Sequence, residues 1–242
     1  MLKLLKILPS ILFLVIFVSP FTYAFNVLIT ETEFRMLSDN CKKFYSVTQV
    51  GRNLGYTNKY SLTEFRAAFD DAEKAGGAWH YCAGLVYLSR AALESSEAKK
   101  IATYKRALDE ISFSARKVLP DHRVYGEIHV NQAKAAYLTG DTAASRTMLE
   151  KLIAKMPTYT PAKIELARQL AKDKQLQDAI DLLLSVDPTV RDKSADLNYA
   201  LGVYYFRLKN LDESSIYARK AYQLGYPLPW LKQQLRKNGI TM

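Results

Sequence analysis

The chain has 242 residues and a formal net charge of +10, from 34 Lys and Arg against 24 Asp and Glu. This length is enough for one elongated domain or two small ones, with a sizeable core. Only the first segment is apolar enough to be considered as a membrane span, so a protein with several spans is excluded. The basic residues are spread along the chain, which favours a solvated surface over a dedicated anion-binding face.

The first 24 residues have the pattern of a secretory signal peptide. Lys3 and Lys6 give a positive start, residues 7–18 are almost wholly apolar, and the small residue Ala24 precedes the expected cleavage point. Cleavage would lower the net charge to +8 and leave an exported protein, periplasmic or secreted. The alternative is an uncleaved segment that anchors the protein to a membrane, although its apolar run is shorter than the roughly 20 residues of a span.

Residues 25–76 are expected to form an irregular N-terminal helical segment. Apolar spacing predicts a helix over residues 31–43, followed by a polar, glycine-containing stretch over residues 49–59. Ser61, with Glu64 three residues later, fits a capping box, and this predicts a further helix that ends at the next pair of glycines.

Cys41 and Cys82 are the two cysteines of the chain. An even pair in an oxidising compartment predicts a disulfide, and the alternative is two separate buried thiols. A bridge would join the N-terminal segment to the first strong helix. In the entropy model, a closed loop of that length stabilises the fold by roughly 4 kcal/mol.

From residue 77 onward, apolar residues recur at spacings of three and four, which is typical of helices, and Gly and Pro separate the helical stretches. Near the carboxyl end, a large and a small residue are followed by a tyrosine, an acidic turn, small residues at close-packing positions and a closing proline. These positions are Leu201, Gly202, Tyr205, Leu211, Asp212, Glu213, Ala218, Ala221 and Pro227. The pattern resembles the tetratricopeptide repeat (TPR) family, whose unit is an antiparallel helix pair of about 34 residues.

Similar patterns occur upstream, so residues 121–227 are interpreted as three degenerate TPR units. The first carries Ala133, Tyr137, Gly140, Asp141, Leu149, Leu152 and Pro157, and the second carries Leu166, Ala167, Leu170, Asp178, Ala179, Leu183 and Pro188. Residues 77–120 resemble a divergent, elongated TPR-like pair with about a dozen extra residues. These extra residues would either lengthen both helices or extend the turn.

Residues 228–242 are expected to form a capping helix and tail. Trp230, Leu231 and Leu235 share one helical face, which could cover the last repeat or dock on a partner. The resemblance therefore implies an all-α fold, an α-solenoid of antiparallel helix pairs forming a TPR-like superhelix with a C-terminal capping helix.

No catalytic residue, metal site or cofactor is predicted, because the chain has no phosphate-binding glycine loop, HExxH motif or nucleophile elbow. The rival hypothesis is a periplasmic enzyme or metal-binding protein that uses the region of His80 and Cys82. The aromatic cluster around Trp79 and Tyr81 is interpreted as core packing in preference to a ligand site.

In the TPR family the first helix of each pair lines a concave surface, and this resemblance implies a partner-binding groove. The corresponding positions are Lys134, Tyr137, Arg168, Lys172, Tyr199, Val203 and Phe206. A groove with these residues would suit a protein or peptide partner, with an acidic peptide carrying large apolar residues as the natural ligand. Nucleic acid is not expected, since no recognition motif is present. The predicted function is a non-catalytic exported adaptor that supports assembly of a cell-envelope machine, such as a secretion, pilus or polysaccharide export system.

Overall fold

The computed structural model describes residues 25–241, so the predicted signal peptide lies outside the described residues. Four helices form the N-terminal segment, and their bounds are α1 (Glu31–Met36), α2 (Asp39–Ser46), α3 (Gln49–Asn53) and α4 (Leu62–Lys74). The prediction of one helix over residues 31–43 is wrong. The Ser38 hydroxyl accepts a hydrogen bond from the Cys41 N–H and starts a second helix there.

Side-chain caps start the two helices α3 and α4 of this segment. The capping box of Ser61 and Glu64 is present and starts α4, as expected. The polar, glycine-containing stretch over residues 49–59, for which no helix was predicted, contains the short helix α3, and the Thr48 side chain caps its start.

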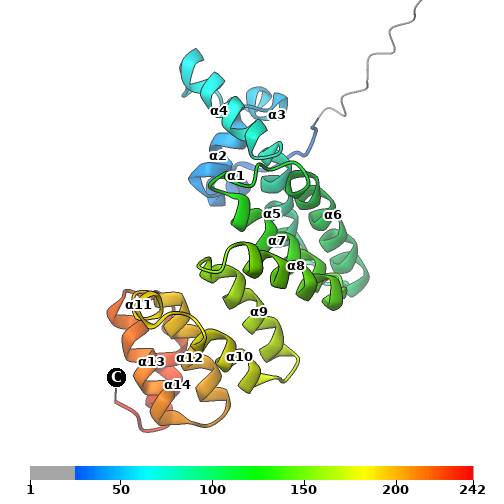
Figure 1. Cartoon of the computed structure of the whole chain (residues 1–242). Helices are drawn as coiled ribbons and strands as arrows, with labels where there is room; N and C mark the ends of the chain where they lie inside the picture. Colours follow the sequence, from blue (N-terminus) through cyan, green and yellow to red (C-terminus); the bar gives the residue numbers. More distant parts are fainter. Residues whose placement is uncertain (1–24, 242) are drawn as a thin grey trace, which may run out of the picture.

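The rest of the chain is a stack of antiparallel helix pairs, which confirms the predicted all-α solenoid (Figure 1). The first two pairs are α5 (Ala78–Leu93) with α6 (Glu97–Ala115), and α7 (Tyr125–Leu138) with α8 (Thr142–Lys155). The last two are α9 (Thr160–Lys172) with α10 (Leu176–Leu184), and α12 (Ala195–Arg207) with α13 (Leu211–Gln223). The extra residues of the first pair lengthen both of its helices instead of extending the turn. A short helix that the sequence did not predict, α11 (Pro188–Arg191), joins the last two pairs.

Helix α14 (Trp230–Lys237) covers the open end of the last pair, as expected of a capping helix. Leu231 and Leu235 are fully buried against α12 and α13. A Cβ atom added at Gly202 would lie 2.8 Å from Leu231 Cδ2 and 3.3 Å from the backbone N of Ala218. The glycine therefore lets α12 approach both the second helix of its pair and the cap.

A disulfide joins Cys41 of α2 to Cys82 of α5, with a Cα–Cα distance of 5.4 Å. Both residues are buried in one core with Phe44, Tyr45 and Tyr81. The N-terminal segment is thus tied by a covalent bond and a shared core to the first helix pair.

Within residues 25–241, no helix is both long enough and apolar enough to cross a membrane.

Candidate functional site

A groove of about 550 Å³ runs across the first helices of the last three pairs, α7, α9 and α12. It contains five of the seven predicted partner-binding residues: Lys134, Arg168, Lys172, Tyr199 and Val203. Its other lining residues are Val130, Asn131, Pro161, Ile164, Glu165, Ala171, Asp196, Ala200, Tyr204, Arg207 and Tyr226. The charged residues are four cations and two carboxylates, so the groove carries a net charge of +2.

The groove is built by helical spacing. Arg168 lies one turn after Glu165, and Lys172 lies one turn after Arg168, so all three project from the same face of α9. Tyr199 and Val203 lie one turn apart on α12 and supply an apolar wall opposite these charges.

Glu165 also lines the groove, although the sequence-based prediction did not include it. It is 7% exposed, and its carboxylate accepts hydrogen bonds from the Arg168 guanidinium, one of them 2.8 Å long from Nε, and from Gln169 Nε2 at 2.9 Å. The i, i+3 spacing of Glu165 and Arg168 was a usable signal, since opposite charges at that spacing pair on a helix. Arg168 is therefore largely neutralised within the protein.

Burial is the largest single influence on the pKa of the Arg168 guanidinium and acts to lower it. The hydrogen bond to Glu165 and the nearby charges, first of all that of Glu165, together outweigh burial, so the pKa is raised. Lys172 has the opposite shift. Partial burial first, and the neighbouring charge of Arg168 second, lower the pKa of its ammonium group. Among the described residues, no ion pair involves Lys134 or Lys172, so these two lysines are the cations most open to a partner's carboxylates.

Tyr137 does not line the groove. Its ring lies beneath the two cations of α9, with the Arg168 Cζ and the Lys172 Nζ each 5.5 Å from the ring centroid. The Tyr137 hydroxyl donates a hydrogen bond of 3.1 Å to Asp173 Oδ1, and this fixes the ring in place. Tyr137 therefore positions the cationic side chains that line the groove.

Phe206 also lies outside the groove. Its ring meets that of Trp230 edge-on, with centroids 6.0 Å apart, and it packs against the Leu231 and Leu235 core of the capping helix. Its predicted role in partner binding is not supported by this placement, because α14 covers that end of the α12 face.

The region of the rival metal or enzyme hypothesis has a different arrangement. The Cys82 thiol is consumed by the disulfide, and His80 Nδ1 lies 2.6 Å from Glu110 Oε2. Within the described part of the chain, no group of three His, Cys, Asp or Glu residues is placed to hold a metal ion. Tyr81 is buried, with its hydroxyl donating to Glu127 Oε1 at 2.6 Å.

These features define the class of the protein as an all-α solenoid of helix pairs with a basic and apolar groove. No protein-family model matches the chain, and no curated protein matches it. A similar solved structure is the crystal structure of YrrB, described as a TPR protein with an unusual peptide-binding site. The two chains share 19% sequence identity with a TM-score of 0.46, over 86% of this chain and 98% of YrrB. At this level of similarity, the fold class rests on the helix pairs of the chain itself.

Proposed function

We propose that this protein is a non-catalytic, exported scaffold whose groove holds a segment of a protein or peptide partner. The observation that carries the proposal is the pair Lys134 and Lys172, which form no ion pair within residues 25–241 and line the same groove as Tyr199 and Val203. A segment with Asp or Glu residues next to a large apolar side chain would satisfy both halves of this surface. A protein or peptide ligand for this chain would be in keeping with the description of YrrB as a protein with a peptide-binding site.

Export is part of the proposal and has two supports. One is the signal-peptide pattern of the first 24 residues. The other is the disulfide, because such bonds persist in oxidising compartments. We therefore place the protein in the periplasm or outside the cell. From this compartment and the repeat fold we infer, by analogy, a role in assembling a cell-envelope machine. Mass measurement of the protein from the envelope fraction tests this, since an intact first segment would favour the membrane-anchored alternative.

The groove is tested by reversing the two open charges in the variant Lys134→Glu/Lys172→Glu. Arg168 is a poor target, because reversing it would place two carboxylates together and disturb α9. The matched control is Lys105→Glu/Lys151→Glu, which makes the same change in net charge at exposed lysines of α6 and α8. Partners are captured from an envelope extract with each form, and the affinity of the captured partner is then measured by calorimetry.

We expect the groove variant to bind at least about tenfold more weakly than the natural protein, since two favourable charge contacts become repulsive. The control should bind as the natural protein does. If both double variants bind equally well while remaining folded by circular dichroism, the groove is not the binding site.

A further inference from the structure

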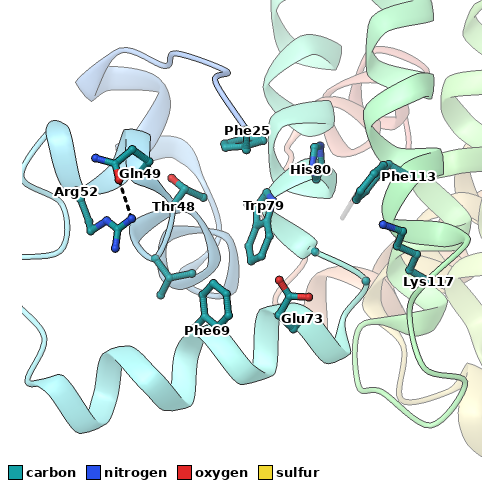
Figure 2. A pocket seen from close by; sticks show the side chains of 13 residues that line it. Phe25, Thr48, Gln49, Arg52, Phe69, Glu73, Trp79, His80, Phe113 and Lys117 are labelled. Atoms are coloured by element: carbon teal, nitrogen blue, oxygen red, sulfur yellow. Dashed lines mark hydrogen bonds between the residues drawn. The ribbon is translucent and has the colours of Figure 1, made fainter. Parts of the chain in front are cut away.

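A second concave site lies at the opposite end of the solenoid, where α3, α4 and the α5–α6 pair meet (Figure 2). Its volume is about 550 Å³, and it shares no residue with the groove over α7, α9 and α12. Its lining includes five aromatic rings, two cationic side chains and one carboxylate. We call it the aromatic pocket.

Rings from four separate segments face this pocket. Phe69 of α4 stacks on Trp79 of α5, with centroids 5.7 Å apart. His80 lies 4.0 Å from Phe113 of α6 and 5.0 Å from Phe25, again between ring centroids. Figure 2 shows these side chains arranged around one opening.

The floor of the pocket is glycine. A Cβ atom added at Gly77 would lie 3.4 Å from Phe113 Cε1 and 3.6 Å from Trp79 Cε2, so the space between these two rings is left open by the missing side chain. Phe69 remains 40% exposed, and Trp79 is only partly buried. These aromatic faces would lose contact with water if a flat apolar group entered the pocket, and this is a favourable process.

The charges around the pocket favour an anion. Arg52 and Lys117 are exposed cations, and Glu73 is the single carboxylate, so the lining carries a net charge of +1. Within the described residues, none of the three takes part in an ion pair. The Lys117 ammonium lies 3.8 Å from the Phe113 ring centroid, directly at the wall where a ring would enter.

We propose that the aromatic pocket binds an aromatic anion, a flat ring that carries a carboxylate or sulfonate group close to it. The ring packs against Trp79, Phe69 and Phe113, and Lys117 pairs with the anionic group. Glu73 opposes the anion and thereby limits its affinity. A quaternary ammonium ligand, which aromatic boxes also hold, is disfavoured by the two cations.

The test uses two fluorescent probes with the same ring system, anilinonaphthalene sulfonate, which is anionic, and N-phenylnaphthylamine, which is neutral. The Trp230→Phe background leaves Trp79 as the sole tryptophan of the chain, so quenching of its emission reports binding at this pocket. We expect saturable binding of the anionic probe, at least about threefold tighter than that of the neutral probe. The difference should disappear near 1 M salt, where the Debye length is roughly 3 Å.

Three variants separate the contributions. Lys117→Gln should lower the affinity for the anionic probe about three- to tenfold, and Glu73→Gln should raise it about two- to fivefold. Neither variant should alter the affinity for the neutral probe. Phe69→Ala should weaken both probes, and because Phe69 is already partly exposed, the protein should stay folded. Lys105→Gln, at an exposed lysine of α6 that does not line the pocket, is the matched control and should change nothing.

Two results would overturn the proposal. One is equal affinity for both probes with no effect of Lys117→Gln, and the other is weaker anionic binding in Glu73→Gln. Competition then distinguishes the source of the natural ligand. If phenylpropanoate displaces the anionic probe at a lower concentration than a peptide ending in phenylalanine does, the natural ligand is a free aromatic acid. The reverse order indicates a peptide terminus.

Discussion

The disulfide between Cys41 and Cys82 should supply a large share of the stability of the N-terminal half. The two cysteines are separated by 41 positions in the sequence. For a closed loop of that size, the entropy model gives about 4 kcal/mol at 25 °C, which compares with 5–15 kcal/mol of net stability for a typical domain. We therefore expect the variant Cys41→Ala/Cys82→Ala to lose about 3–5 kcal/mol of unfolding free energy.

The assay is urea unfolding followed by circular dichroism, with and without a reductant. Reductant should lower the unfolding midpoint of the natural protein to nearly that of the double variant, and should leave the variant unchanged. Hydrogen exchange should show the loss first in α2, because the bridge ties it to α5. If reductant leaves the midpoint of the natural protein unchanged, the bridge does not stabilise the fold in the way the loop argument requires.

Three single substitutions are also expected to lower the free energy of unfolding. The hydrogen bonds from the Arg90 guanidinium hold the pKa of Glu33 down, at about 2 instead of 4.5. Glu33→Gln should therefore cost about 1–2 kcal/mol at neutral pH, and the difference from the natural protein should fade as pH falls from 4.5 toward 2 in acid unfolding curves. Leu231→Ala should cost about 2–5 kcal/mol and speed hydrogen exchange in α12 and α13, because Leu231 is fully buried in the cap. Gly76→Ala should cost at least about 2 kcal/mol in urea unfolding, since the residue has a φ of +75° and a Cβ atom would lie 2.3 Å from the Ser114 carbonyl oxygen.

Local chemistry made much of the fold predictable. Ser61 with Glu64, and Gly140 with Asp141, mark helix boundaries through hydrogen bonds and a turn within a few residues, so the sequence specifies them directly. The same reasoning missed the cap at Ser38, because the apolar spacing continues across it and hides the break.

The candidate sites were less predictable because they depend on contacts between distant segments. Family resemblance places Phe206 on the inner face of α12, but only the packed position of α14 shows that Trp230 meets it. The aromatic pocket needs Phe25 and Phe113 beside Trp79, and no spacing within the sequence brings these three residues together.

Both ends of the solenoid are covered by elements of the chain itself. At one end, the N-terminal segment shares a core and a disulfide with α5, and at the other end α14 buries Leu231 and Leu235 against α12 and α13. Covered ends limit the addition of further helix pairs, which is the role of caps in repeat proteins. The side formed by α7, α9 and α12 has no such cover among the described residues, and it holds the open lysines Lys134 and Lys172. A partner that meets the solenoid from this side could therefore reach charged and apolar groups without unfolding any element, as the proposed partner-binding groove requires.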